Sequence, residues 1–356
     1  MKLQVRLIEA RLRAPFVSGS GAVDSRGLVL ATLQDSSGLV GFGEAAPLPH
    51  YDGVGTDEVH AALEDCRDAL AAADRDAQHR ELLAACAEVT TLPQALAAID
   101  LALWDLRGRR AGEPVWRLLR AESADAAARG PARAGAIEVN ATIAAADRAT
   151  AAAQGAAARS AGFRCVKVKV GLGDDAGRLA AVRAATGRRI AIRVDANGAW
   201  SVEEALASLR ALEPVGIELC EEPASGLEPI AAVAADSPVA VALDESASRP
   251  GALERRVCEL ICLKVARCGG ITGLLDAARR ARAAGYEVYL ASTLDGPLGI
   301  AAALHAAAAI APDRACGLAT LGLFDGRDDP LPARAGQIAV PGGPGLGDGL
   351  VEWYGV

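Results

Sequence analysis

Residues 164–171, RCVKVKVG, place two lysines two positions apart within a run of valines. β-branched residues favour strands with a buried face, where an ammonium group is costly. Side chains alternate along a strand, so Lys167 and Lys169 share one face. The face that carries both lysines therefore needs a function that justifies the cost.

Strand-like segments similar to this one recur along the chain from about residue 136. They alternate with Ala-, Arg- and Leu-rich helical patterns such as DDAGRLAAVRAAT (174–186). Eight strands alternating with helices over roughly 180 residues predict a (β/α) barrel. A doubly wound open sheet shows the same alternation, but no glycine fingerprint follows the first strand. The eight segments are IEVNATI (137–143), CVKVKVG (165–171), IAIRVDA (190–196), GIELCEEP (216–223), VAVALDES (239–246), LICLKVA (260–266), EVYLAST (287–293) and ACGLAT (315–320).

The segments before and after this repeat predict a second, smaller unit. Short strand-like runs up to about residue 55 are followed by helical patterns over 56–120, which predict an α+β domain over residues 1–130. Breaker residues at 128–135 indicate its end, and the barrel is expected over 131–322. The tail, 323–356, contains no further βα unit, and we expect it to return to the first domain.

Composition narrows the class of partner. The 356 residues are 51% hydrophobic and carry a net charge of −8, which argues against nucleic acid. No apolar run reaches the roughly 20 residues that cross a bilayer, and the N-terminal segment lacks the apolar stretch of a signal peptide. Eight cysteines without a C-x-x-C pair predict reduced thiols. We expect a cytoplasmic protein that acts on a small molecule, and leave open whether it forms a homo-oligomer.

Ionisable residues stand at the carboxyl ends of five successive barrel strands, where barrel enzymes place their chemistry. One acid at a strand end means little, but five strands in succession are a strong signal. The residues are Lys167 and Lys169 on the second strand, Asp195 on the third, Glu221 on the fourth, Asp244 on the fifth and Lys264 on the sixth.

Adjacent strands bring Asp195, Glu221 and Asp244 to one side of the barrel mouth. Three carboxylates stay ionised at close range only around a cation, and an all-oxygen set favours Mg²⁺ over Zn²⁺, with Mn²⁺ as a substitute. Lys169 and Lys264 come from strands four apart and are expected to face each other across this centre. Two opposed amines suit removal of a proton at one face of a bound substrate and delivery at the other.

These motifs resemble those of the enolase superfamily, in its muconate-lactonizing-enzyme subgroup. The resemblance covers essentially the whole chain, and implies an N-terminal α+β capping domain and a modified barrel, (β/α)7β. It also implies that Asp195, Glu221 and Asp244 bind Mg²⁺ and that Lys169 and Lys264 form the acid/base pair. The shared step is removal of the proton α to a carboxylate, giving an enediolate. The motifs are GFGEAAPL (41–48), AIDLALWDLRG (98–108), K-x-K (167–169), DANGAW (195–200), EEP (221–223), DES (244–246) and LKVARCGG (263–270).

The segments at the last two strands differ most among relatives and bear on the reaction. CGLAT (316–320) followed by DDPL (328–331) is most similar to o-succinylbenzoate synthases, lyases that dehydrate a cyclohexadiene carboxylate in menaquinone biosynthesis. Dipeptide epimerases usually carry Asp-x-Asp on the eighth strand, where this chain has Cys316, Gly317 and Leu318, although KVARCGG (264–270) is also typical of epimerases. A racemase or epimerase of a dipeptide or N-acylamino acid and a muconate-type cycloisomerase are the alternatives.

Five residues are candidates to bind the substrate. Lys167 and the hydroxyls of Ser292 and Thr293 could hold a carboxylate, and Asn197 follows Asp195 closely enough to support substrate or metal-bound water. Asp295 stands where many relatives have Glu. Two hypotheses from other classes are a metal-free lyase with a Schiff-base lysine and a barrel that binds without catalysis.

Overall fold

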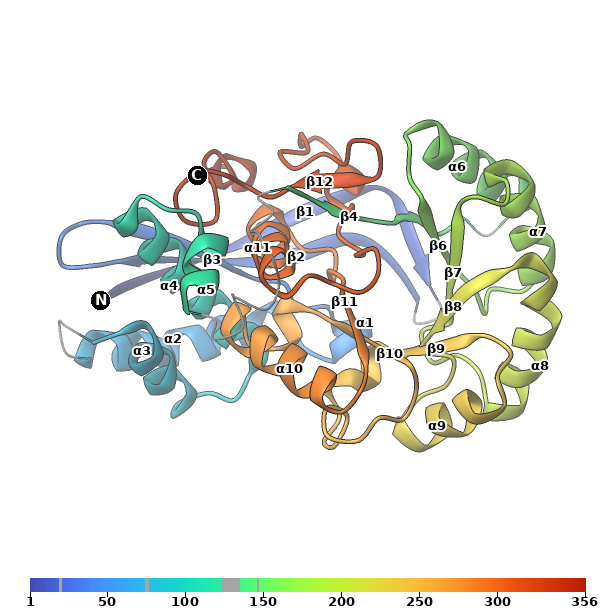
Figure 1. The fold of residues 1–356 in the computed structure, drawn as a ribbon. Coiled ribbons are helices and arrows are strands. Elements are labelled where there is room, and N and C mark those ends of the chain that lie inside the picture. The colour runs from blue at the N-terminus through green and yellow to red at the C-terminus, as the bar shows by residue number, and fades with distance from the viewer. Residues whose placement is uncertain (19–20, 74–76, 123–134, 146) are drawn as a thin grey trace.

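The structure, a computed structural model, describes residues 1–18, 21–73, 77–122, 135–145 and 147–356. An antiparallel sheet and helices from the first third of the chain pack beside a curled parallel sheet surrounded by helices (Figure 1). The modified barrel with an N-terminal capping domain is therefore confirmed.

The capping domain is built on a three-stranded antiparallel sheet, β1 (Lys2–Ser18), β2 (Gly21–Gln34) and β3 (Val40–Ala45). Strands β1 and β2 are longer than the sequence predicts. The Gly/Ser-rich stretch 17–26, a candidate lid, instead belongs largely to this hairpin, and its residues 19–20 lie outside the described residues. The helices of this domain are α1 (Pro49–Asp52), α2 (Thr56–Ala72), α3 (His79–Ala87), α4 (Pro93–Ala111) and α5 (Val115–Glu122).

The glycines of the GFGE motif let β3 lie directly against helix α4. A Cβ atom on Gly43 would stand 1.9 Å from the carbonyl oxygen of Ala98, and one on Gly41 would stand 2.3 Å from that of Ala102. Backbone therefore packs on backbone, and no larger residue fits without moving the helix. Helix α4 is buried on most of its surface, which explains why its sequence is apolar on nearly every side.

The barrel contains a seven-stranded parallel sheet in the order β11-β10-β9-β8-β7-β6-β5. Its strands are β5 (Ala141–Ile143), β6 (Cys165–Lys169), β7 (Ala191–Asp195), β8 (Ile217–Glu221), β9 (Ala240–Leu243), β10 (Leu260–Leu263) and β11 (Glu287–Leu290). Its helices are α6 (Arg148–Ser160), α7 (Asp175–Thr186), α8 (Val202–Leu212), α9 (Leu227–Asp236), α10 (Ile271–Ala283) and α11 (Pro297–Ile310). Branched side chains of these strands fill one continuous core with the helices.

The eighth predicted strand, ACGLAT, closes the ring through short parallel bridges. Cys316 pairs with Val139 and Gly317 pairs with Ala291, so this segment joins the two edges of the sheet. The first predicted strand, 137–143, is divided into β4 (Ala136–Glu138) and β5. Strand β4 leaves the barrel and pairs antiparallel with β12 (Gln337–Ala339) of the tail.

The tail contacts both parts of the chain. Near its end, the Tyr354 hydroxyl donates to Glu44 of the capping domain and accepts from the Leu298 N–H of the barrel at 3.0 Å. Glu44 also accepts from the Gly296 N–H, at 2.8 Å. The predicted boundary at residue 130 lies outside the described residues, and the boundary at 322 stays a prediction.

All eight cysteines are free thiols, seven of them buried. Within the described parts of the chain, no helix is long and apolar enough to span a bilayer. The cytoplasmic location and any self-association stay predictions.

Candidate active site

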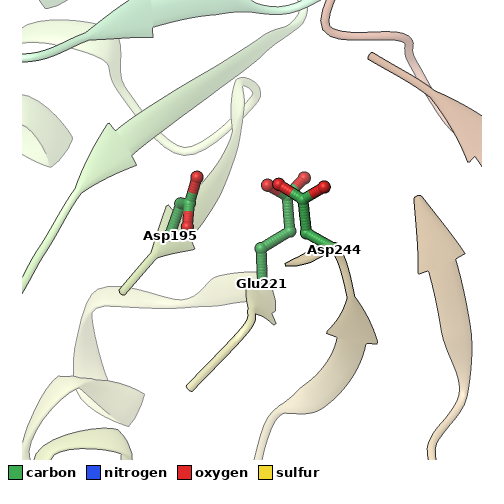
Figure 2. A group of neighbouring side chains, drawn as sticks. All are labelled: Asp195, Glu221 and Asp244. Carbon is green, nitrogen blue, oxygen red and sulfur yellow. The ribbon is translucent and has the colours of Figure 1, made fainter. Parts of the chain in front are cut away.

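Three carboxylates gather at the carboxyl ends of neighbouring strands. Asp195 ends β7, Glu221 ends β8 beside it in register, and Asp244 directly follows β9. One oxygen from each lies within 4.8 Å of the others (Figure 2). All three side chains are buried.

The donor set fits a divalent metal ion. Buried carboxylates this close repel one another unless cations lie between them, and three carboxylate oxygens match a hard cation that keeps positions open for other oxygens. When bound, such an ion would stabilise negative charge that develops on a substrate carboxylate. The strand ends therefore place Asp195, Glu221 and Asp244 as a candidate metal centre.

Lysines flank this centre on two sides. Lys169 donates to Asp195 at 2.6 Å and Lys167 pairs with Asp195 at 2.8 Å and with Glu221. Lys264 pairs with Asp244, at the other end of the triad. Strands β6 and β10, which carry Lys169 and Lys264, are separated by β7, β8 and β9. The predicted arrangement, a triad with an amine on either flank, is present.

Attraction to the triad dominates the charge state of two lysines. Burial alone would lower the pKa of Lys167, but the charges of Asp195 and Glu221 outweigh it and hold that pKa well above its usual value. The pKa of Lys264 is raised in the same way, because Asp244 outweighs the effect of burial. Three lysines thus balance three carboxylates, which explains how one interior accommodates six ionisable groups.

Asn197 occupies the predicted place beside the triad, in a left-handed turn with φ of 49°. Its side-chain oxygen accepts from Lys169 at 2.9 Å, and its side-chain nitrogen donates to Glu245 at 2.9 Å. Its backbone N–H donates to Asp195, also at 2.9 Å. Asn197 therefore ties a carboxylate of the triad to one of the lysines.

Two further carboxyl groups brace the strand ends behind the triad. Glu222 accepts from the backbone N–H groups of Asp244 and Ser246, at 2.8 and 3.0 Å. Burial, and then the charge of Glu245, raise the pKa of Glu222 to about 8. Burial, and then the charge of Asp244, raise that of Glu245 to about 7. The second Glu of the EEP motif thus holds the loop that carries Asp244.

A cavity lies over the three lysines. Ser292 and Thr293, predicted to bind substrate, line it as expected. Asp295 is not among the lining residues; it accepts from the N–H of Thr293 at 2.9 Å and from its hydroxyl at 2.6 Å, and so orients that side chain. The described lining residues are Phe16, Ser18, Gly21, Val23, Leu48, His50, Tyr51, Thr142, Lys167, Lys169, Asn197, Asp244, Lys264, Ala291, Ser292, Thr293, Leu294, Gly317 and Thr320.

Two tyrosines contact the triad that the sequence did not single out. Tyr51 of α1 donates to Asp244 at 2.9 Å, and Tyr289 of β11 donates to Glu221 at 2.5 Å. The sequence signal for Tyr51 is its place beside His50 in PLPHYDGV, a segment that could close over the barrel mouth. Tyr289 carries a weaker signal, a polar tip in an otherwise apolar strand.

The fold and this centre define a class of protein: a capped barrel enzyme whose strand ends combine a metal triad with opposed lysines. Residues 148–352 match the family described as enolase C-terminal domain-like, and residues 2–120 match the mandelate racemase/muconate lactonizing enzyme N-terminal domain. The chain therefore belongs to the mandelate racemase/muconate lactonizing enzyme family of the enolase superfamily, as its motifs predicted. Its relatives are isomerases or lyases, and we conclude that it is an enzyme of this kind.

Individual relatives point to more than one reaction. The chain is 30% identical to an L-Ala-D/L-Glu epimerase of Clostridium acetobutylicum, over 84% of this chain and 83% of that protein. It is 41% identical to an o-succinylbenzoate synthase of Mycobacterium tuberculosis, over 55% of this chain and 61% of that protein, so the match spans under two thirds of the synthase. The L-Ala-D/L-Glu epimerase of Bacillus subtilis, solved with substrate, superposes with a TM-score of 0.87 at 27% identity, with 98% of each chain covered.

Proposed function

We propose that the protein is a magnesium-dependent lyase that removes the proton α to a carboxylate and then eliminates water, as an o-succinylbenzoate synthase does. The observation that carries this proposal is the charge of the cavity wall. Among its described lining residues, three are lysines and only one, Asp244, has a carboxylate. That carboxylate is already engaged by Lys264 and Tyr51.

Such a wall suits a substrate that carries carboxylates and no amine. The precursor of o-succinylbenzoate has one carboxylate on its ring and another on its succinyl arm. The ammonium group of a dipeptide would instead need an acid in the wall. Gly317 lines the cavity at the eighth strand, between Cys316 and Leu318, so this stretch supplies none.

The residues of the site then have separate tasks. Lys169 takes the α-proton onto Nζ, and Lys264 faces the reacting carbon from the other side. Lys167, Ser292 and Thr293 hold the substrate carboxylate. The bond between the β-carbon and the hydroxyl breaks as the ring double bond forms, and the hydroxyl leaves as water with a proton from a lysine.

The second candidate is an epimerase of a dipeptide or N-acylamino acid. Similarity to L-Ala-D/L-Glu epimerases over most of the chain favours it, and amines on both flanks of the triad suit a reaction in which one side removes the proton and the other returns it. The absence of an acid from the described cavity wall argues against a substrate with a free amine.

A substrate screen with Mg²⁺ distinguishes these candidates. The protein is assayed with the cyclohexadiene precursor, a dipeptide panel and N-acylamino acids in D₂O, with dehydration followed by absorbance and α-deuterium by NMR. Our proposal expects fastest turnover of the cyclohexadiene, and loss of turnover with EDTA. Faster epimerisation of a dipeptide would replace the proposal by the second candidate. Activity that survives EDTA, with borohydride trapping of the substrate on a lysine, would indicate a Schiff-base lyase instead.

A further inference from the structure

The Tyr51 hydroxyl lies between the two groups at one end of the triad. It accepts a hydrogen bond from Lys264 Nζ at 2.6 Å and donates one to Asp244 Oδ1 at 2.9 Å. The ring of Tyr51 also lies beneath the ammonium group, with its centroid 4.1 Å from Nζ. One side chain thus contacts Lys264 by a hydrogen bond and a cation–π interaction.

Tyr51 belongs to the capping domain, whereas the groups that it contacts belong to the barrel. It lies in helix α1 (Pro49–Asp52), 213 residues before Lys264 in the sequence. Burial, followed by the charge of Asp244, raises the pKa of Tyr51 well above its usual value, so the phenol keeps its proton and donates to the carboxylate. The direction of both hydrogen bonds is therefore fixed.

A lysine on a four-carbon stem needs such contacts to hold one orientation. Asp244 alone would let the ammonium group move around the carboxylate, and a misplacement of about 1 Å can reduce a rate about 100-fold. The hydroxyl of Tyr51 fixes a second point on the same nitrogen.

We propose that Tyr51 is a positioning residue for Lys264, so that the barrel acquires its second amine in working orientation only when helix α1 of the capping domain rests on it. This inference rests on the proposed acid/base role of Lys264. It adds a requirement that the barrel residues alone do not contain: closure of the cap and alignment of Lys264 are one event.

The test compares Tyr51→Phe with a matched control, Tyr286→Phe. The Tyr286 hydroxyl also makes two hydrogen bonds, accepting from the Val257 N–H at 2.9 Å and donating to the Arg255 carbonyl at 2.8 Å, and Tyr286 does not line the cavity. In the Mg²⁺-loaded enzyme, we expect Tyr51→Phe to lower kcat tenfold or more with KM changed less than threefold. Tyr286→Phe should leave both constants within twofold of the wild type. A structural role alone would affect the thermal stability of both variants and the kcat of neither.

A second measurement needs no substrate and so remains decisive if the proposed reaction is wrong. Hydrogen–deuterium exchange is followed by mass spectrometry in peptides that cover residues 48–54 and 263–270. Tyr51→Phe should speed exchange in both peptides several-fold, and Tyr286→Phe in neither. Exchange at the wild-type rate in the Tyr51→Phe variant would overturn the inference, as would an unchanged kcat on any substrate that the wild type turns over. Failure of the wild type on the cyclohexadiene alone would refute only the proposed function.

Discussion

Replacing Lys169 or Lys167 by Met separates the catalytic role of this strand from its structural role. Both ammonium groups are buried and contact Asp195, at 2.6 and 2.8 Å respectively. Met keeps a long apolar stem and removes the charge, so packing changes little. The two variants differ in which carboxylate loses its partner.

The contacts predict unequal costs. In Lys169→Met, Asp195 keeps Lys167 and the N–H of Asn197, so the free energy of unfolding should fall by less than about 2 kcal/mol. In Lys167→Met, Glu221 loses its paired cation and keeps the hydroxyl of Tyr289. An uncompensated buried charge costs about 3–5 kcal/mol, so this variant should be clearly less stable.

Activity should follow the opposite order of severity relative to stability. With its base removed, Lys169→Met should lose α-proton exchange by about 10³-fold or more although it stays folded. Urea unfolding with EDTA present gives the stabilities, and NMR in D₂O with Mg²⁺ gives the exchange. Wild-type exchange in Lys169→Met would refute the assignment of the base. Equal stability losses in the two variants would refute the account of the buried ion pairs.

Three further predictions follow from other contacts. Tyr289→Phe removes the hydroxyl that donates to Glu221 and should weaken Mg²⁺ binding about 10- to 100-fold by calorimetry; unchanged affinity would mean that this contact does not orient the ligand. Gly43→Ala should lower the free energy of unfolding by about 3 kcal/mol in urea, because its Cβ would meet the Ala98 carbonyl oxygen at 1.9 Å; a loss below 1 kcal/mol would show that helix α4 yields easily. Burial, and then the charge of Asp295, raise the pKa of Glu44 from 4.5 to about 8, so the folded state loses stability as pH rises from about 4.5 through 8. Glu44→Gln cannot ionise, and between pH 5 and pH 9 it should avoid a loss of about 4 kcal/mol that wild type shows; parallel pH profiles of the two proteins would contradict this.

The barrel and its charged centre could be predicted because parallel strands end at one edge. Once the βα period was recognised, Asp195, Glu221 and Asp244 had to converge, and Lys169 and Lys264 had to lie on either side. Each of these residues is placed by the strand that carries it, and strand spacing can be read locally.

Contacts that depend on how the cap settles on the barrel could not be predicted in this way. Tyr51 reaches Lys264 across 213 residues, and no local pattern encodes that distance. The hairpin formed by β1 and β2 is a second case, because the pairing partner, rather than the Gly- and Ser-rich composition of 17–26, decides that its residues are extended. The eighth strand is a third, since Cys316 and Gly317 are bridged at two pairs and no longer ladder forms.

The bond between Tyr354 and Glu44 has a consequence for how the protein is made. The two residues are 310 positions apart, so strand β3 leaves the ribosome long before its hydrogen-bond donor is synthesised. At about 5–20 residues per second, the delay is roughly 15 to 60 s. During that interval a buried acid of the nascent cap waits for its partner, which makes this cap a natural client for a chaperone.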